Sequence, residues 1–521
     1  MITEDQSEVV TFLASPSTHA GAAVERVETH ASVVFLAGPH AWKLKRAVRY
    51  DYLDFSTIER RRAMCDAEVR INRRTAPGLY RGVVAVTRQP DGSLALGGVG
   101  TPVDWLVEMV RFDQEGLLDR LAARDALDRA LMPTLAAAIA RFHAEAEPRV
   151  DHGGATGMAW IVDGNATGFA EAGAGILDPA PCASVTDSAR DAVRRHRELL
   201  DTRRDGGFVR QCHGDLHLRN IVLLDGAPTL FDGIEFNDRI ACIDVLYDLA
   251  FLLMDLWRRR LLRHASAVWN GYLSETADYG GVGLMPLFLS CRAAVRAKTS
   301  VAAALLQGDP GRRRDLEEIA QDYLKLARDL LRPPPPCVIA IGGLSGSGKS
   351  TLARALAPLL GAAPGAVVVR SDEIRKRLRG LDPLQRLGPE GYTAEMSERV
   401  YRTVIDRAQL VVGGGHAVVA DAVFARPADR ESVERIAAGA RAPFVGLWLD
   451  APASELIARA GRRGLDASDA AADVIRRQLA EDTGRIAWHR IDASFPPERV
   501  LDGVSRLLRE RLTGAIVRAV A

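Results

Sequence analysis

Two stretches of the chain carry residue types whose spacing suits the handling of a nucleoside triphosphate. The first, IGGLSGSGKST, contains G-x-x-x-x-G-K-[ST] from Gly343 to Ser350. We expect a buried strand before it (337–341) and a helix after it (350–360), so its backbone N–H groups can turn toward a phosphate at a helix start. Lys349 can reach the β- and γ-phosphates, and the Ser350 hydroxyl can ligate Mg²⁺. The candidate nucleotide contacts are Gly343, Ser345, Gly346, Ser347, Gly348, Lys349, Ser350 and Thr351.

The second stretch runs from residue 208 to residue 238 and reads FVRQCHGDLHLRNIVLLDGAPTLFDGIEFND. It contains His213-Gly214-Asp215, then Asn220 at D-x-x-x-x-N spacing, and Asp232 after two predicted short strands, 221–224 and 228–231. Such a hairpin would hold Asn220 and Asp232 opposite each other as Mg²⁺ ligands, while Asp215 accepts a proton from a hydroxyl group. Asp- and Asn-rich loops are often plain turns, but the order and spacing of the three residues favour a site.

The composition excludes several classes of protein. With 47% apolar and 26% charged residues, the chain reads as globular, and a formal net charge of +1 gives no general reason to expect a nucleic acid or a membrane partner. The six cysteines form no C-x-x-C pair, which suits reduced cytoplasmic thiols. No signal peptide is expected at the acidic N-terminus, and the longest apolar run, 410–420, is too short for a membrane span.

The clearest boundary is the run of four prolines within residues 331–336, a stiff spacer that no helix can cross. It predicts a first domain at 1–330 and a second at 337–521. In the second domain, strands predicted at 366–369, 417–420 and 444–449 alternate with helices, as in a parallel sheet covered on both faces.

The first domain resembles the aminoglycoside phosphotransferase family, relatives of the protein kinases. HGDLHLRN followed by FDGIEFND carries the resemblance, together with Asp244 and Asp248 in IDVLYDLAFL. It implies an α+β, bilobal protein-kinase-like fold with a small lobe at about 25–110 and a large lobe at about 111–330. It also implies Asp215 as catalytic base, Asn220 and Asp232 as magnesium ligands, and Asp248 as a residue that stabilises the catalytic loop.

The small lobe should present a lysine to the α- and β-phosphates. Ala41-Trp42-Lys43 matches the A-x-K of the third kinase strand, within a hairpin expected at 32–37 and 41–48. Lys43 and Lys45 share one strand face, so either could serve; we favour Lys43, with Glu68 of a helix at 59–72 as its ion-pair partner. No G-x-G-x-x-G precedes this strand, so another loop must cover the phosphates.

Other parts of the first domain are less specific. The strand expected at 105–112 would lie beside adenine, with the backbone of Glu108, Met109 and Val110 as candidate contacts. His143 is expected to pack or to form a hydrogen bond. Residues 150–205 combine Gly-rich loops with Arg194, Arg195 and Arg197, and the resemblance implies that helices in such an insertion help to shape the acceptor pocket.

The second domain resembles the small P-loop kinases of the zeta-toxin, gluconate kinase and polynucleotide kinase group, so an α/β P-loop NTPase follows the kinase-like domain. Asp372 follows a predicted strand at its carboxyl end, where ligands bind in such sheets. The resemblance implies Asp372 as base, Arg375 near the acceptor, and Asp421 as a second acid near Mg²⁺. Lid residues would be Arg459, Arg462 and Arg463.

Both halves are therefore expected to bind ATP and Mg²⁺ and to phosphorylate a hydroxyl group of a small molecule. Two alternatives stay open. The second domain could be a nucleotide-loaded regulator of the first, or it could phosphorylate a nucleic-acid 5′-hydroxyl, against which the near-zero net charge argues.

Overall fold

The computed structural model describes residues 2–171, 175–381, 385, 387–461 and 472–512, and the chain divides into two compact units. The first comprises Met1–Trp160 with Arg197–Leu252, and the second comprises Ile161–His196 with Leu253–Ala521. Among the described residues, no helix has the length and apolar character that crossing a membrane requires.

The first unit begins with a six-stranded antiparallel sheet in the order β1-β2-β3-β8-β6-β7. Its strands are β1 (Val24–Glu28), β2 (Ser32–Ala37), β3 (His40–Lys45), β6 (Tyr80–Arg88), β7 (Leu94–Leu96) and β8 (Thr101–Val110). The hairpin of β2 and β3 confirms the expected pair of strands, with Val34 opposite Lys43. A separate two-residue pair, β4 (Arg49–Tyr50) and β5 (Leu53–Asp54), follows β3.

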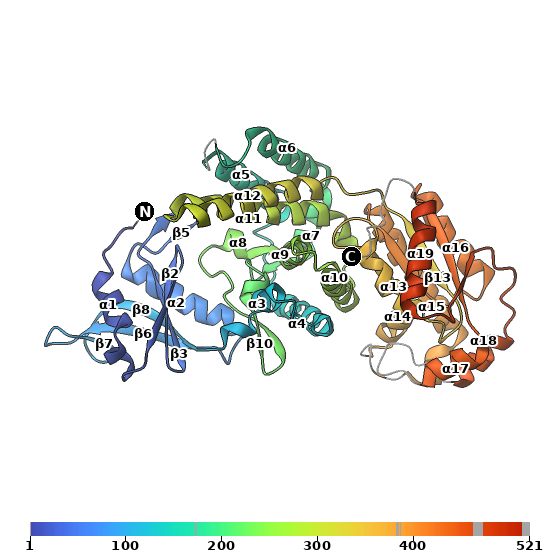
Figure 1. Ribbon diagram of the computed structural model, residues 1–521, viewed down its shortest axis with the longest axis horizontal. Coiled ribbons are helices and arrows are strands. Elements are labelled where there is room, and N and C mark those ends of the chain that lie inside the picture. Colours follow the sequence, from blue (N-terminus) through green and yellow to red (C-terminus); the bar gives the residue numbers. More distant parts are fainter. Residues whose placement is uncertain (1, 172–174, 382–384, 386, 462–471, 513–521) are drawn as a thin grey trace. The chain divides into compact units, whose positions relative to one another are not determined.

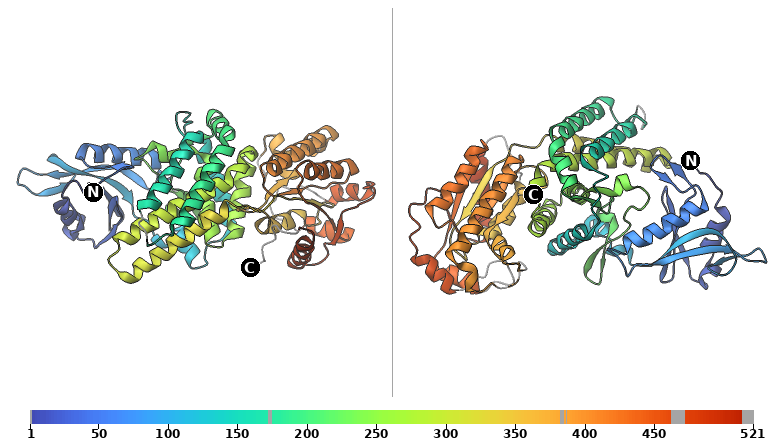
Figure 2. Two further views of the ribbon diagram at one scale, coloured as in Figure 1. Left: turned by 90° about the horizontal axis from the view of Figure 1, so that it is seen from above. Right: turned by 180° about the vertical axis from the view of Figure 1, so that it is seen from behind.

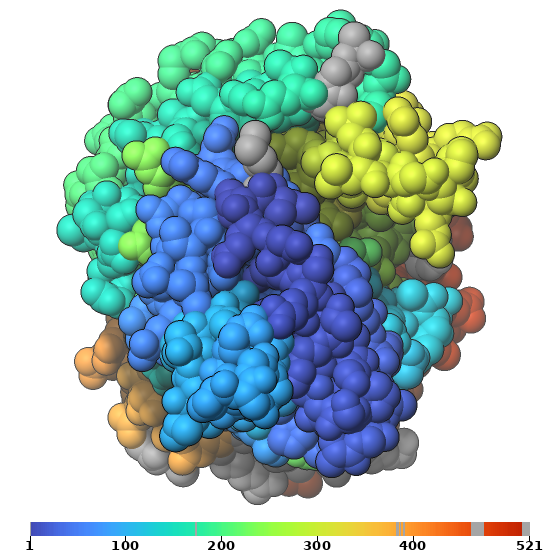
Figure 3. Space-filling model, turned by 90° about the vertical axis from the view of Figure 1, so that its left-hand side faces the viewer, coloured from blue at the N-terminus to red at the C-terminus, as the bar shows by residue number. Residues whose placement is uncertain are grey.

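Side-chain alternation gives this sheet two apolar faces, each covered by one helix. Trp42 and Leu44 of β3 face α1 (Ser7–Ala14), whose Leu13 is fully buried against them. Ala41 lies on the other face, under α2 (Ile58–Asn72), with Val69. Figure 2 shows α2 lying along this face, and Figure 3 shows the surface where the N-terminal residues and the β6–β7 hairpin meet. Because Lys43 and Lys45 alternate with Trp42 and Leu44, they point toward α2.

The rest of the first unit is mostly helical and surrounds two small strand pairs. Its elements are α3 (Leu118–Ala123), α4 (Met132–Glu145), α7 (Arg197–Asp205), β9 (Val209–Gln211), β10 (Ile221–Leu224), β11 (Ala227–Leu230), α8 (Asp238–Ala241) and β12 (Cys242–Asp244). β10 and β11 form the predicted hairpin, with Ile221 opposite Leu230. Helices α5 (Gly154–Glu171) and α9 (Val245–Arg258) contribute residues to both units.

Most of residues 150–205 are helical, which agrees with the helices implied for this part of the chain, and less of it forms Gly-rich loops than its composition predicts. Besides α5 and α7 they include α6 (Pro179–Arg195) of the second unit. Gly168 of α5 lies against the side chain of Lys298, where a Cβ would meet Lys298 Cδ at 2.8 Å. Close packing therefore explains the presence of Gly168 within α5, although the low helix propensity of glycine predicts a helix break there.

Besides its parts of α5 and α9, the second unit combines four helices with the P-loop fold. The helices are α6, α10 (Leu262–Thr276), α11 (Met285–Leu306) and α12 (Pro310–Leu330), and a short 3₁₀ segment, η5 (Tyr279–Leu284), precedes α11. α11 and α12 pack along each other, and the hydroxyl of Ser290 donates to Ala327 O at 2.8 Å.

The P-loop fold is built on a five-stranded parallel sheet in the order β14-β15-β13-β16-β17. The strands are β13 (Val338–Gly342), β14 (Val367–Arg370), β15 (Val418–Asp421), β16 (Phe444–Asp450) and β17 (His489–Asp492). β13 to β15 are buried along their whole length, as expected of strands covered on both faces. This confirms the parallel α/β arrangement that the sequence predicts.

Helices cover both faces of the parallel sheet (Figure 1). They are α13 (Lys349–Leu356), α14 (Ser371–Leu378), α15 (Ala394–Gly413), α16 (Pro427–Gly439), α17 (Ala453–Gly461), α18 (Ala472–Ala480) and α19 (Pro497–Arg511), with 3₁₀ segments η6 (Ala357–Leu359) and η7 (Pro389–Tyr392). α13 and α19 share an apolar core with the central strands, for example Leu356 and Val504 against Ile339.

Candidate active sites

The first site is centred on two lysines that share one carboxylate. Lys43 Nζ lies 2.8 Å from Glu68 Oε1 and 2.6 Å from Asp232 Oδ1. Lys45 Nζ lies 2.6 Å from Glu68 Oε2 and also pairs with Glu235. Strand β3, helix α2 and the segment after β11 therefore meet at this point. Of the two lysines that the sequence leaves open, both reach Glu68, and Lys43 is the one paired with Asp232.

The partners of the two lysines differ in their exposure to solvent. The side chains of Lys45, Glu68 and Glu235 are 1%, 0% and 6% exposed, whereas Asp232 is 44% exposed. Burial disfavours the charge on Lys43, but Asp232 and Glu68 outweigh it and hold the lysine pKa well above its ordinary value. Burial likewise opposes the charge on Glu68, yet the two ammonium groups lower its pKa to about 2. Lys45, Glu68 and Glu235 therefore form a buried group with a structural role, whereas Lys43 also contacts the more exposed Asp232.

Asp232 is held by residues that the sequence pattern does not reveal. Its backbone N–H donates to the Tyr80 hydroxyl at 3.0 Å. Asn72, one helical turn after Glu68, accepts from the N–H of Gly233 at 2.7 Å and donates to the Gly233 carbonyl at 3.3 Å. Asp232 itself has φ +60°, a conformation that a residue other than glycine keeps only when its surroundings fix it.

The loop before the β10–β11 hairpin carries Asp215 and Asn220. The Asn220 side chain donates to Asp215 Oδ2 at 2.9 Å, and the N–H of Phe231 donates to the carbonyl of Asn220 at 3.0 Å. The Asp215 carboxylate is therefore held in one orientation. Asn220 contacts the backbone of Phe231, which follows β11 and directly precedes Asp232. The structure brings these three predicted residues to one hairpin.

Asp248 holds the backbone of the Asp215 loop. Its fully buried carboxylate accepts from the N–H groups of His213 and Gly214 at 3.0 and 2.9 Å. His143 of α4 contacts the same carboxylate at 3.1 Å. Both residues thus have the hydrogen-bonding roles that the sequence analysis expected.

The strand expected beside adenine is β8, and its end is tied into the sheet. Glu108 pairs with His40 at 3.0 Å through its side chain, while the Val110 N–H donates to Leu79 O at 2.8 Å. Adenine contacts at Glu108, Met109 and Val110 remain a prediction. Beyond the strand, Phe112 packs edge-on against Phe231, with ring centroids 5.2 Å apart, next to the apolar cluster of Met109.

The donor set of this site fits Mg²⁺. The cation prefers oxygen ligands, and the Asp232 carboxylate and the Asn220 amide oxygen are of that kind. Asn220 uses its nitrogen for Asp215, so its oxygen is the atom suited to a metal. The site contains two positively and three negatively charged side chains, so its formal net charge does not repel an added cation. These side chains are Lys43, Lys45, Glu68, Asp232 and Glu235.

The second site is the loop between β13 and α13. Gly343, Gly346 and Gly348 have φ values of +132°, +89° and +91°. At Gly346 a side chain would meet the carbonyl of Leu456, so the loop needs glycine there for space as well as for conformation. Ser350 and Thr351 lie in the first turn of α13, and Lys349 Nζ donates to Leu344 O at 3.0 Å across the loop.

A further contact to this loop comes from α18. The N–H of Ser345 donates to Gln478 Oε1 at 2.9 Å. The side-chain carbonyl of Gln478 thus occupies one backbone N–H group of the phosphate loop. Nothing in the local sequence around Gln478 points to this contact, because the two residues lie 133 positions apart.

The carboxyl ends of β14 and β15 bring acids and arginines together beside the loop. Arg370 Nε lies 3.2 Å from Asp421 Oδ2, and the two residues are partners in the strand register. Burial and the charge of Asp421 raise the pKa of Asp372, against the opposing effect of Arg370, Lys349 and Arg375. Asp372 and Asp421, both predicted from the sequence, therefore belong to one electrostatic cluster with Lys349.

The predicted arginines have different surroundings. Arg375 donates to Gly391 O at 2.9 Å and lies 5.0 Å from the ring centroid of Tyr392. Arg459 donates to Ala493 O at 2.7 Å and pairs with Glu455 at 2.9 Å. Arg462 and Arg463 lie outside the described residues.

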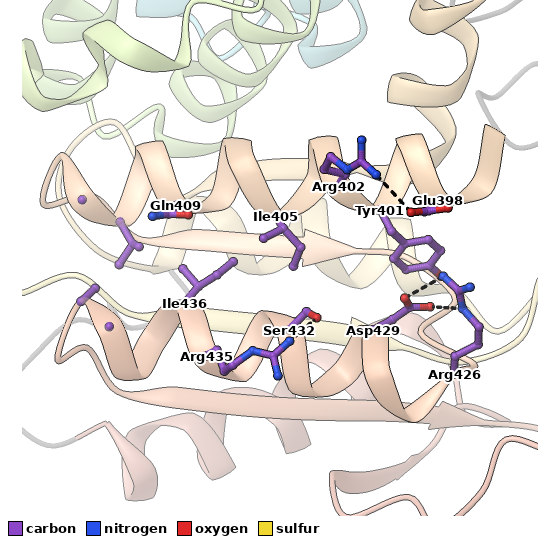
Figure 4. Close-up of a pocket in the computed structure, with 14 residues that line it drawn as sticks. Glu398, Tyr401, Arg402, Ile405, Gln409, Arg426, Asp429, Ser432, Arg435 and Ile436 are labelled. Carbon is purple, nitrogen blue, oxygen red and sulfur yellow. Dashed lines mark hydrogen bonds and ion pairs between the residues drawn. The ribbon is translucent and has the colours of Figure 1, made fainter. Parts of the chain in front are cut away.

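A groove between α15 and α16 is separate from the phosphate loop (Figure 4). Its volume is about 630 Å³. At one end Arg426 pairs with Asp429 at 2.8 Å, and its guanidinium lies 5.6 Å from the Tyr401 ring centroid. Nearer the other end, Ile405 and Ile436 face each other.

Comparison with known proteins identifies relatives of nearly the whole chain. The uncharacterized protein Rv2004c of Mycobacterium tuberculosis is 32% identical over 489 residues, which are 91% of this chain and 93% of the relative. The chain belongs to the Rv2004c family. The Mycobacterium bovis protein Mb2027c matches to the same extent.

The second half of this Rv2004c-family protein has additional relatives. Residues 338–483 match the AAA domain family. A segment of 123 residues, 23% of the chain, is 37% identical to the adenylyl-sulfate kinase of Myxococcus xanthus and covers 62% of it. The C-terminal part is therefore a P-loop kinase domain.

A solved structure, the ethanolamine kinase of Plasmodium vivax, aligns with 63% of this Rv2004c-family chain and with 90% of its own. The identity is 10% and the TM-score is 0.40, so this likeness has no bearing on function.

Proposed function

We propose that this protein is a bifunctional ATP-dependent phosphotransferase whose two sites each transfer the γ-phosphoryl group of ATP to a hydroxyl group of a small molecule. The observation that carries the first site is the contact of Lys43 with both Glu68 and Asp232. Three segments far apart in the sequence thereby supply a phosphate-binding cation, the acid that orients it, and a metal-binding acid.

At the first site, Asp215 accepts the proton of the acceptor hydroxyl as the oxygen attacks the γ-phosphorus. An oxygen–phosphorus bond forms, the bond to the β-phosphate breaks, and ADP leaves. The hydrogen bond from Asn220 orients the Asp215 carboxylate for this role. Asn220 and Asp232 would hold Mg²⁺, which when bound neutralises charge on the phosphates.

At the second site, the amides of the phosphate loop and Lys349 bind the phosphates, and Asp372 accepts the proton of the acceptor. Because burial raises the pKa of Asp372, its carboxylate is a stronger base than an exposed aspartate. Ser350 and Asp421 would hold Mg²⁺ there. The kinase relative of this domain supports phosphoryl transfer, while the acceptor remains part of the proposal.

The two acceptors are proposed to be small metabolites. The formal net charge of +1 provides no basic surface excess of the kind that nucleic-acid binding favours. Transfer to a polycationic antibiotic does not follow from a kinase-like fold, since one fold hosts many substrates.

The test is a transfer assay with γ-labelled ATP and a pool of metabolites, run on the full chain. Wild type should give two labelled products, of which Asp215→Asn loses one and Lys349→Ala loses the other. Matched controls are Asp187→Asn and Lys325→Ala, because both residues are exposed and neither belongs to the predicted groups of either site.

The outcomes separate the alternatives. A single product that depends on Asp215, with a rate that Lys349→Ala alters, would replace the second kinase by a regulatory module. Label transferred to an oligonucleotide in a Lys349-dependent reaction would make nucleic acid the second acceptor. No labelled product beyond the controls would refute the proposal.

A further inference from the structure

Helix α10, which precedes the proline spacer, contacts the edge strand of the P-loop sheet within the second unit. β14 is the edge of that sheet, and an edge strand leaves a row of backbone groups without a neighbour. Asn270 of α10 accepts from the Val368 N–H at 2.7 Å and donates to Ala366 O at 3.2 Å. Its side-chain amide thus pairs with β14 as a neighbouring strand would.

One helical turn further, on the same face of α10, Ser274 begins a chain of hydrogen bonds. Its hydroxyl donates to Glu373 Oε2 at 2.8 Å. The other oxygen of Glu373 lies 2.6 Å from Arg370 Nη1, and Arg370 Nε lies 3.2 Å from Asp421 Oδ2. Four side chains, from α10, α14, β14 and β15, are joined end to end.

This chain leads into the chemistry of the second site. Arg370 and Glu373 flank Asp372 in sequence, and Asp421 lies opposite Ile341 in β13, the strand that runs into the phosphate loop. The side chains of Arg370 and Asp421 are 6% and 5% exposed. Loss of a partner there would therefore be costly, because water does not reach the site to replace it. The guanidinium group of Arg370 contacts the carboxylates of both Glu373 and Asp421. The position of Glu373 therefore determines the orientation in which Arg370 contacts Asp421.

We propose that Ser274 of α10 is a positioning residue of the P-loop site and acts through Glu373 on the carboxylate of Asp421. The proposal rests on phosphoryl transfer at that site, as argued above. It assigns to a helix outside the P-loop fold a part in the activity of that fold.

The same helix supplies a matched control. Arg377 of α14 donates to the carbonyl of Glu275, next to Ser274, but has no part in the chain of hydrogen bonds to Asp421. Arg377→Gln therefore removes a contact between α10 and α14 and leaves the connection to Asp421 in place. Ser274→Thr keeps the hydroxyl, and Ser274→Ala removes it.

The test measures ATP hydrolysis at the second site of the full chain, with the first site silenced by Asp215→Asn. We expect Ser274→Ala to lower kcat about tenfold, the scale of one hydrogen bond to a charged group, and to raise the Mg²⁺ concentration at half-saturation, with KM for ATP nearly constant. Ser274→Thr should restore kcat, and Arg377→Gln should behave as the parent protein.

Two results would overturn the inference. Parent-like kinetics of Ser274→Ala, or equal losses in Ser274→Ala and Arg377→Gln, would reduce α10 to a structural contact. Lys349→Ala distinguishes this from a failure of the proposed function: hydrolysis that does not depend on Lys349 would remove the second site itself, and the positioning role with it.

Discussion

Replacing Lys43 and Lys45 in turn by methionine should separate phosphate binding from structural support. Both ammonium groups contact Glu68, but their second partners differ. Lys45 pairs with the buried Glu235, whereas Lys43 pairs with Asp232, whose side chain is 44% exposed. Lys45→Met leaves the buried carboxylate of Glu235 without its cation, whereas Lys43→Met leaves the carboxylate of Asp232, which water can reach.

The expected losses of stability follow from these surroundings. Removing one partner of a buried ion pair costs about 3–5 kcal/mol, and 1 kcal/mol shifts the Tm of a domain of about 150–250 residues by about 2–4 °C. Lys45→Met should therefore lower the Tm of the first unit by about 6–20 °C. Lys43→Met keeps Glu68 paired and should cost about 1 kcal/mol, or about 2–4 °C.

ATP affinity should respond in the opposite order. Lys43→Met removes a charge-assisted contact to phosphate worth about 1.5–3 kcal/mol, so the Kd of ATP should rise about 10- to 100-fold. Calorimetry in a Lys349→Ala background reports the first site alone, and scanning fluorimetry reports the Tm. Lys325→Met, at an exposed position of α12, is the control. Unchanged ATP affinity in Lys43→Met, or a Tm as low as that of Lys45→Met, would refute this assignment of roles.

Three more predictions concern the rest of the molecule. The two lysines hold the pKa of Glu68 at about 2, below its ordinary 4.5. The contribution of Glu68 to stability is therefore complete above pH 4.5 and is lost as the pH falls toward 2. The free energy of unfolding, measured in urea, should accordingly fall less steeply with decreasing pH in Glu68→Gln than in wild type. All six cysteines are buried, and burial raises the pKa of Cys65 to about 12, so a thiol reagent should label none in the native protein and all after denaturation. Gly346→Ala should abolish ATP binding at the P-loop because the Leu456 carbonyl occupies the space of a side chain, whereas Gly413→Ala, with open space around it, should not.

The parts of both sites that the sequence predicts are those encoded locally. The glycines from Gly343 to Gly348 act on their own backbone, so their spacing is enough to indicate the loop. Asp215 and Asn220 lie five residues apart, and their hydrogen bond follows from one short loop. Alternation along β3 restricts the proposed phosphate-binding lysine to Lys43 or Lys45, but alternation alone cannot choose between them.

The choice between those lysines depends on partners that are distant in the sequence. Asp232 lies 189 residues from Lys43, and Glu235 lies 190 residues from Lys45. No periodicity in the chain encodes which acid meets which lysine. Asn72 illustrates the same limit, because its role appears only when α2 lies beside Gly233, 161 residues away.

Tertiary packing also explains why glycines within residues 150–205 lie in a helix and not in loops. The glycines of α5 suggest breaks when they are judged by propensity alone. Gly168 instead allows α5 to approach Lys298 of α11, so a residue that weakens an isolated helix makes this packed helix possible.

The pairing of Asn270 with β14 has a practical consequence for dividing the molecule. The proline run suggests a natural point of cleavage, and a fragment starting at residue 337 would retain every predicted group of the second site. That fragment would also lack Asn270, and the N–H of Val368 and the carbonyl of Ala366 would face solvent or another molecule. We expect such a fragment to self-associate through this strand, and a version that starts before residue 262 to stay monodisperse.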